Sequence, residues 1–348
     1  MLRVHVCKAL EPEERATLEA ALPAGSVLTA GPEEQGDAYR VLIGGRPSRE
    51  DLERSPALEV VLIPFAGLPR ETGELLADFP QLAVHNLHHN AAATAEGALG
   101  LLLAAARRLV VADQALRQGD WRIRYEACGS PILAGKTALV LGYGAIGQRV
   151  ARALAALDVE VLAVRRRVRP DDPPHVHPVA ELDALLPRAQ VVIVCLPETA
   201  ETRGLLDARR LGLLPQGALL VNVGRGPVID EEALFNALRD GHLGGAGIDV
   251  WYRYPKSPQP VGGEPEQFTC SGEGASERPP ETKREDERQG TLPSAFPFHE
   301  LETVVLSPHR AAHGDVNEDL RWRAVGELLQ RLASGQPLPH RVDLAAGY

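Results

Sequence analysis

The sequence predicts an α/β protein built from two domains, each containing a parallel sheet. Two series of apolar, strand-like runs alternate with helix-like stretches along the chain, and this rhythm is typical of parallel sheets. The length of 348 residues exceeds that of most single domains, which favours one domain for each series. The strands of the second series are nearly continuous runs of Val, Leu and Ile, as expected where helices cover both faces of a sheet.

The first series occupies residues 1–90. Its strand-like runs are LRVHVC, SVLTAG, YRVLIGG, LEVVLIPF and LAVHNL, separated by helix-like stretches such as EPEERATLEAAL and RETGELLADF. After Asn90 the stretch AAATAEGALGLLLAAARRLVVADQALRQG is too long and too rich in Ala and Leu for a strand. It is apolar around most of its circumference, so we expect one long, largely buried helix at a domain or subunit interface.

The second series contains the runs TALVLG, VEVLAVR, VVIVCLP, ALLVNVG and GAGIDVW, with helices in RVARALAAL and DEEALFNALRDG. Residues 256–292 interrupt it with a stretch rich in Pro, Gly, Glu and Arg, which we expect to be a disordered or mobile surface insertion. The strand LETVVLSPH then resumes the fold, and a helix near DLRWRAVGELLQRLASG closes it.

Composition and charge argue against several classes of protein. The net charge of −10 repels a phosphate backbone, so nucleic acid is not an expected partner. The chain has no long uncharged apolar run and its start lacks the layout of a signal peptide, so we expect a cytoplasmic protein without a membrane partner. The scattered cysteines form no CxxC motif and predict neither disulfides nor a metal site; they are Cys7, Cys128, Cys195 and Cys270.

The segment TALVLGYGAIGQRVARALAAL places the pattern GxGxxG between an apolar strand and an amphipathic helix. The glycines allow a tight turn and let the backbone approach a pyrophosphate, which the helix N-terminus attracts. The pattern alone also fits an ordinary glycine turn, but the strand–turn–helix context favours a Rossmann domain that binds a dinucleotide. The predicted cofactor-binding residues of this segment are Gly142, Tyr143, Gly144, Ala145, Ile146 and Gly147.

The end of the next strand bears on the choice of cofactor. Versions that bind NAD carry an acidic residue there, which accepts a hydrogen bond from the ribose 2′-hydroxyl, whereas this strand ends in Arg165, Arg166 and Arg167. A guanidinium binds a 2′-phosphate through paired, charge-assisted hydrogen bonds, so Arg165 and Arg166 favour NADP, with NAD as the alternative. The other interpretation is a solvated basic turn in an arginine-rich protein.

Three further segments are VNVGRGPVIDEEAL around Arg225, GAGIDVW around Asp249 and VVLSPHRAAHG around His309. Together with LGYGAIG and LPETAET they resemble the D-isomer-specific 2-hydroxyacid dehydrogenases, over almost the whole chain apart from the insertion. The resemblance implies an NAD(P)-binding Rossmann domain in residues 91–315 and a discontinuous, flavodoxin-like substrate domain in residues 1–90 and 316–348. It also implies a homodimer, formed through the apolar helix that follows Asn90.

The residue types of two of these segments fit such a reaction. Hydride transfer between a 2-hydroxy acid and a nicotinamide requires a cation for the substrate carboxylate and a group that exchanges the hydroxyl proton. Arg225 suits the first role as a forked donor, and His309 suits the second because imidazole titrates near neutral pH. The resemblance implies these same roles, and it further implies a nicotinamide contact from Asp249, cofactor-groove contacts from Pro197, Thr202 and Val223, and substrate contacts from Phe65, Ala66, Gly67 and Asn90.

The other histidines near these segments have plainer interpretations. His88 and His89 are adjacent, but a metal site needs a third ligand and the sequence shows none nearby, so we expect substrate-loop or surface residues. His85 lies in a predicted strand and is expected to be structural. His313 either lines the mouth of the site or caps a turn.

One position departs from the family pattern. The family usually carries a Glu five residues after the Asp, where it orients and charges the catalytic His, and here the counted position is Tyr254. Tyr can hydrogen-bond an imidazole but brings no negative charge at neutral pH. Three alternatives follow: His309 works with a neutral partner such as Tyr254, Glu300 or Glu302 substitutes, or ordinary activity is lost.

The sequence therefore favours an oxidoreductase that prefers NADPH and acts on a small 2-oxo acid or D-2-hydroxy acid, a substrate class that comes from the resemblance. The alternative is a catalytically weak dinucleotide-binding protein that regulates or binds a partner. Tyr254 and the polar insertion support that alternative. The sequence names neither the particular acid nor the physiological direction.

Overall fold

The computed structural model describes residues 1–348 except 35, 37, 126–129, 256–290 and 348, so the predicted insertion lies almost wholly outside the described residues. The chain divides into two compact units. Unit 1 contains Met1–Asn90 and His313–Tyr348, and unit 2 contains the described residues from Ala91 to Ala312. Within the described residues, no helix is both long and apolar enough to cross a membrane.

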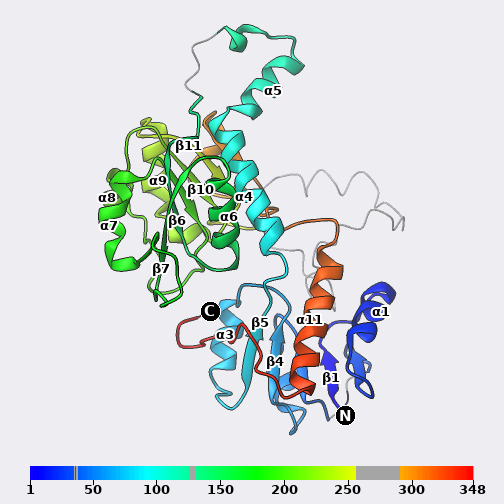
Figure 1. Ribbon diagram of the computed structural model, residues 1–348. Helices are drawn as coiled ribbons and strands as arrows, with labels where there is room; N and C mark the ends of the chain where they lie inside the picture. Colours follow the sequence, from blue (N-terminus) through cyan, green and yellow to red (C-terminus); the bar gives the residue numbers. More distant parts are fainter. Residues whose placement is uncertain (35, 37, 126–129, 256–290, 348) are drawn as a thin grey trace. The chain divides into compact units, whose positions relative to one another are not determined.

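Unit 1 contains a five-stranded parallel sheet with the order β2-β1-β3-β4-β5 (Figure 1). This is the strand order of flavodoxin-like folds, so the predicted class of this domain is confirmed. The strands are β1 (Arg3–Val6), β2 (Val27–Ala30), β3 (Val41–Ile43), β4 (Val60–Ile63) and β5 (Ala83–Asn86). The helices are α1 (Pro12–Ala21), α2 (Arg49–Glu53), α3 (Arg70–Leu76) and α11 (Asn317–Ala333).

The core of unit 1 has two apolar layers because successive side chains of a strand point to opposite faces of the sheet. In β4, Val60 and Leu62 belong to one buried cluster, and Val61 and Ile63 belong to the other. Helix α11 supplies Trp322 and three further buried residues to the first cluster and packs closely on α1. The chain after α11 then pairs with the edge of β5, because the Val342 amide donates to the Val84 carbonyl (2.8 Å).

Unit 2 contains a seven-stranded parallel sheet with the order β12-β11-β10-β9-β6-β7-β8, which is the Rossmann order and confirms the predicted fold. Its strands are β6 (Thr137–Leu141), β7 (Glu160–Arg165), β8 (Val176–Pro178), β9 (Val191–Val194), β10 (Ala218–Asn222), β11 (Leu243–Ile248) and β12 (Val304–Leu306). Its α-helices are α4 (Ala91–Ala106), α5 (Leu109–Arg117), α6 (Ala145–Ala155), α7 (Leu182–Leu185), α8 (Ala208–Gly212) and α9 (Glu231–Arg239). Short 3₁₀ turns are η1 (Arg122–Arg124), η2 (Val179–Glu181), η3 (Leu186–Arg188), η4 (Gly226–Val228) and η6 (Phe298–Glu300).

The strand order of this sheet reverses between β6 and β9. Ligands of open α/β sheets bind at the carboxyl ends of the strands beside such a reversal. All four residues of β9 are buried, as expected for a central strand covered on both faces. The segments that follow β6, β7, β9, β10, β11 and β12 at this edge are therefore the ones in which a site is expected.

The prediction of a single long helix after Asn90 is wrong, because the structure contains two helices there, α4 and α5. Arg108 lies between them with φ of 50°, a left-handed conformation that ends one helix and starts another. Half of α4 is buried, but α5 buries none of its nine residues. In Figure 1, α5 and the turn after it extend away from the sheet of unit 2.

Candidate functional site

The glycine-rich turn after β6 has the geometry that a bound pyrophosphate requires. Gly142 has φ of 101°, which an L side chain rarely adopts. A Cβ on Gly147 would lie 1.9 Å from the Gly142 carbonyl oxygen, so only glycine lets α6 start this close to the strand. A Cβ on Gly144, the residue directly before α6, would meet nothing within 4 Å. The turn therefore fits a dinucleotide, with Tyr143, Ala145 and Ile146 between its glycines.

At the end of β7, Arg165 was expected to bind the 2′-phosphate of the cofactor, but in the structure it binds a carboxylate. Arg165 Nη1 contacts both carboxylate oxygens of Asp172, at 2.6 and 2.9 Å. The guanidinium that the sequence assigns to a 2′-phosphate therefore already holds a carboxylate. Arg166 is half-buried and Arg167 is exposed. Sequence reasoning missed Asp172, and its only signal was an acidic residue seven positions after the strand end.

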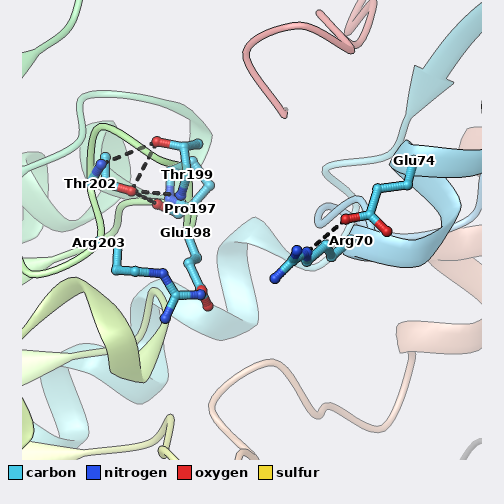
Figure 2. A network of polar contacts seen from close by, with 7 residues as sticks. All are labelled: Arg70, Glu74, Pro197, Glu198, Thr199, Thr202 and Arg203. Carbon is cyan, nitrogen blue, oxygen red and sulfur yellow. Dashed lines mark hydrogen bonds and ion pairs between the residues drawn. The ribbon is translucent and has the colours of Figure 1, made fainter. Parts of the chain in front are cut away.

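The segment after β9 is a rigid turn built on Thr202 (Figure 2). The Thr202 hydroxyl donates to the Pro197 carbonyl (2.7 Å) and accepts from the Thr199 amide (2.8 Å). Glu198 and Arg203 form an ion pair across the same turn. Figure 2 also shows the separate pair Arg70–Glu74 of α3. The predicted groove residues Pro197 and Thr202 thus fix the backbone of this turn.

The turn after β10 presents Arg225. The Asn222 side chain organises it, since Nδ2 donates to the Arg225 carbonyl (3.1 Å) and Oδ1 accepts from the Gly224 amide (3.0 Å). A Cβ on Gly226 would lie 2.4 Å from the Trp251 carbonyl oxygen, which explains the glycine there. Arg225 is half-buried and donates to the Gly224 carbonyl (2.8 Å). Val223, predicted to line the cofactor groove, is 5% exposed and belongs to the core.

Asp249, after β11, is almost fully buried and holds the turn that carries His309. Its Oδ1 accepts hydrogen bonds from the Ser307 hydroxyl (2.5 Å) and from the amides of Arg310 (2.7 Å) and Ala311 (3.0 Å). His309 has φ of 58°, an uncommon backbone conformation for a residue with a Cβ. The carboxylate therefore fixes His309 in this conformation, a role that the nicotinamide assignment did not include.

Asn222 connects these two turns. Its side chain organises the Arg225 turn, and its carbonyl accepts from the Asp249 amide (3.0 Å). Asp249 in turn organises the His309 turn. The structure thus brings Arg225, Asp249 and His309 together at the carboxyl edge of the sheet. Sequence reasoning missed Asn222 because VNVG fits the end of a buried strand.

Tyr254 lies beside His309, with ring centroids 5.6 Å apart and ring planes at 51°. Its hydroxyl oxygen accepts from the Trp251 amide (3.1 Å), which directs the hydroxyl toward the backbone. Tyr254 is 49% exposed, and the partial burial of the residue raises its pKa. This effect outweighs the Trp251 hydrogen bond and the charge of Arg225, which favour the phenolate. Tyr254 therefore stays neutral at neutral pH and provides a ring contact to the imidazole.

The proposed substitution by Glu300 or Glu302 is wrong. Both residues precede β12, whereas His309 follows it, so they lie at opposite ends of that strand. Glu302 pairs instead with Arg108, at 3.3 Å. Glu300 is exposed and lies 4.0 Å from His299.

Unit 1 holds the other predicted substrate residues at the carboxyl ends of β4 and β5. The Asn86 side chain donates to the Ala66 carbonyl (2.6 Å), and the Leu87 amide donates to the Phe65 carbonyl (3.3 Å). These bonds fix the turn Phe65–Ala66–Gly67. A Cβ on Gly45 would lie 2.3 Å from the Phe65 ring, so the neighbouring turn packs directly on it. Asn90 follows β5 and is the last residue before α4.

The histidines of unit 1 are mainly structural. His85 is buried in β5, and its Nδ1 lies 2.7 Å from the Pro339 carbonyl. His88 contacts His340 with ring centroids 4.1 Å apart. Burial, aided by the charges of Arg321 and His88, lowers the pKa of His89 to about 4. His313 is exposed. In the part of the chain that the structure describes, no three potential ligands gather as a metal site.

Burial also determines the protonation state of the Cys195 thiol in unit 2. Cys195 follows β9, and burial raises its pKa to about 12. It is therefore a thiol rather than a thiolate at neutral pH and is not a nucleophile. Cys128 and Cys270 lie outside the described residues.

Fold and site together define a Rossmann protein suited to a dinucleotide. Arg225 follows β10 and His309 follows β12, and the buried carboxylate of Asp249, at the end of the intervening β11, holds the His309 turn. The family model described as "D-isomer specific 2-hydroxyacid dehydrogenase, NAD binding domain" matches residues 99–311. The chain belongs to this family.

Two kinds of enzyme in this family are similar in sequence to the chain. It is 31% identical over 322 residues to the D-3-phosphoglycerate dehydrogenase of Mycobacterium tuberculosis H37Rv, covering 92% of this chain and 53% of that protein. The chain thus spans about half the length of the phosphoglycerate dehydrogenases it matches. It is 32% identical over 233 residues to the glyoxylate reductase of Thermococcus onnurineus, covering 63% of this chain and 67% of that protein.

Solved structures resemble the whole chain. A D-isomer specific 2-hydroxyacid dehydrogenase from Xanthobacter autotrophicus Py2, in complex with NADPH and MES, is 26% identical with a TM-score of 0.74 over 99% of both chains. An NADPH-dependent glyoxylate/hydroxypyruvate reductase from Sinorhizobium meliloti, in complex with NADP and sulfate, is 24% identical with a TM-score of 0.73 over 100% of both chains. The second similarity shows the shared fold.

Proposed function

We propose that this protein reduces a small 2-oxo acid to a D-2-hydroxy acid with NADPH as the preferred cofactor. The observation that carries the proposal is the hydrogen-bonded connection from the Arg225 turn through Asn222 to Asp249 and the His309 turn. It holds a cation after β10 and an acid–base group after β12, with Asp249 at the end of β11, the strand between them. A 2-oxo acid requires these two groups, one for its carboxylate and one for its carbonyl oxygen.

Each residue has a separate task in this mechanism. The Arg225 guanidinium binds the substrate carboxylate. The substrate contacts expected from residues 65–67 stay a prediction. Bound NADPH supplies the hydride. His309 donates a proton from its imidazolium to the carbonyl oxygen as that oxygen gains negative charge. Asp249 holds His309 in place, and Tyr254 packs beside it without adding charge.

The cofactor preference follows from the strand ends of unit 2. The glycine turn and the start of α6 receive the pyrophosphate, and the cluster Arg165–Arg167 replaces the acidic residue that favours NAD. The Xanthobacter relative is in complex with NADPH, which supports the same choice. NAD is the weaker cofactor in this proposal.

The test is steady-state oxidation of NADPH and NADH with glyoxylate, hydroxypyruvate, pyruvate and phenylpyruvate. Turnover with at least one acid, faster at equal concentration with NADPH, is expected. Arg225→Lys is a matched variant that keeps the charge but loses the forked donor, and it should raise KM for the acid more than KM for NADPH. Binding of NADPH without turnover of any acid would refute the proposal.

That outcome would favour the second candidate function, a dinucleotide-binding protein that regulates or binds a partner. Tyr254 is the observation in its favour, because it gives His309 no carboxylate. A cofactor-dependent change in the protein's complexes, without catalysis, would support it.

We infer that the protein is a homodimer and that unit 1 serves as the substrate domain and unit 2 as the cofactor domain. Helix α5 buries no residue, and it exposes Leu109 (53%), Val110 (41%) and Leu116 (51%), followed by Trp121 (58%). Such an apolar arm requires a partner surface. Leu116→Glu should convert the dimer to a monomer in analytical ultracentrifugation, with Arg117→Glu as the polar control. A cytoplasmic location stays a prediction for cell fractionation.

A further inference from the structure

The segment after β7 is organised by one ion pair whose two residues are half-buried. Arg165 is the last residue of β7, and its side chain is 15% exposed, whereas that of Asp172 is 7% exposed. Both side chains are thus less than a fifth exposed, whereas one partner in each of the pairs Lys8–Glu14 and Arg321–Glu318 is 33% exposed or more. An ion pair shielded from water in this way is destabilising unless further hydrogen bonds satisfy the remaining donors and acceptors of its two side chains.

Those hydrogen bonds come from the segment itself. Asp172 Oδ2 accepts from the Arg169 amide (2.7 Å), and the Asp172 amide donates to the Arg169 carbonyl (3.1 Å). Burial disfavours the ionised carboxylate, but the Arg169 amide and the charges of Arg165 and Arg169 outweigh it and hold the pKa of Asp172 below its usual value. The carboxylate is therefore ionised at neutral pH and fixes the turn 169–172 to the strand end.

The other end of the segment is also fixed. The His175 carbonyl accepts from the Ala163 amide (2.9 Å), and His175 Nε2 lies 3.2 Å from the Tyr143 hydroxyl, with the two rings edge to face. Tyr143 belongs to the glycine-rich turn. The segment is thus held both to β7 and to the turn that receives the pyrophosphate.

This arrangement changes the role of Arg165. Its charge is cancelled by Asp172 at hydrogen-bond distance, whereas Arg167 and Arg169 on the same segment are exposed. We propose that Asp172 is a positioning residue for cofactor selection: with Arg165 it folds the segment 166–175 so that Arg166, Arg167 and Arg169 bind the 2′-phosphate of the cofactor. This inference rests on the proposed NADPH preference.

The alternative is that Arg165 itself binds the phosphate and that Asp172 only competes for it. The two hypotheses predict opposite signs for Asp172→Asn. If Asp172 competes, removing its charge frees Arg165 and tightens binding. If Asp172 positions the segment, the same change loosens the turn and weakens binding.

The experiment compares 2′,5′-ADP with 5′-AMP by calorimetry, because the two ligands differ by the 2′-phosphate alone. The proteins are the wild type, Arg165→Gln, Asp172→Asn and the double variant. We expect each single variant to weaken 2′,5′-ADP about 10-fold, near the lower limit for a lost charged hydrogen bond, and to leave 5′-AMP within twofold. The double variant should be no weaker than either single variant, since both disrupt one contact.

Exposed Arg239 and Asp240, whose side chains lie 2.8 Å apart, provide the matched control, and Arg239→Gln and Asp240→Asn should change neither affinity. Arg167→Gln and Arg169→Gln change only exposed side chains, so they test the phosphate contacts even if an Asp172 variant fails to fold. Each should weaken 2′,5′-ADP selectively.

Tighter binding of 2′,5′-ADP to Asp172→Asn would overturn the proposal, as would equal losses for both ligands, additive effects in the double variant, or no effect of Arg167→Gln and Arg169→Gln together. Neither ligand contains a nicotinamide, so these results do not depend on turnover. Absence of 2-oxo acid reduction would refute the proposed reaction alone. A wild type that binds both ligands equally would overturn both the NADPH preference and this inference.

Discussion

Replacement of Asp249 by Ala tests the link between a buried carboxylate and the position of His309. The variant loses one acceptor that serves the Ser307 hydroxyl and the amides of Arg310 and Ala311. Hydrogen bonds to a charged group each contribute about 1.5–3 kcal/mol, which gives an upper limit of about 5–9 kcal/mol. The turn relaxes toward water, so we expect a net loss of about 3–5 kcal/mol, because each of the three donors left without its acceptor costs about 1–3 kcal/mol before that relaxation.

Two assays measure the result. In a unit of this size the loss corresponds to a fall of about 6–20 °C in Tm, by calorimetry. Because His309 loses its fixed position, kcat for 2-oxo acid reduction should fall about 100-fold or more. Asp249→Asn keeps an Oδ1 acceptor and should recover part of both quantities.

Ser307→Ala is the graded control, because it removes one of the three donors and should cost about 1.5–3 kcal/mol, less than Asp249→Ala. The reasoning is refuted if Asp249→Ala leaves both Tm and kcat unchanged. It is also refuted if Ser307→Ala costs as much as Asp249→Ala, since the two backbone bonds would then contribute nothing.

Three further predictions concern histidines. His309→Ala should lower kcat about 100-fold or more, and retained turnover in steady-state assays would contradict its proton-donor role. Tyr254→Glu should shift the basic limb of kcat/KM for reduction to higher pH, because an adjacent carboxylate stabilises the imidazolium; a limb that stays in place would contradict this. His89 has a folded-state pKa of about 4, below its ordinary value of 6.5. As pH falls, the unfolded chain is therefore protonated at this residue before the folded protein is. The free energy of unfolding should decrease between pH 6.5 and 4 by at most about 3 kcal/mol. His89→Gln should flatten that decline in urea unfolding from pH 7 to 4, and an unchanged slope would show that other groups cause it.

Much of the fold was predictable because its signals are local. Continuous runs such as VVIV predict central strands, and the turn requires Gly142 for its positive φ and Gly147 for its close approach to the Gly142 carbonyl. The break at Arg108 was not predictable, because neither Gly nor Pro marks it and the apolar residues resume directly after Arg107 and Arg108. What differs along that stretch is packing: α4 lies on the sheet and α5 does not.

In the candidate site, too, the features with local sequence signals were predictable and the contacts between separate segments were not. Arg225 and His309 were identified from segments with a characteristic order and spacing, and the structure places both at strand ends. The sequence could not show that Asp249 would hold the His309 turn or that Asp172 would pair with Arg165. Both are contacts between residues on separate segments, and the run RRRVRPDD offers several cations and two acids that could pair.

Helix α5 has one more consequence. Isolated helices shorter than about 12 residues are marginal in water, and the nine residues of α5 bury nothing within their own chain. If a second chain covers this arm, its helix formation and its assembly are a single, concentration-dependent event. On dilution the arm would then lose helix content and become a site for proteases before either sheet unfolds.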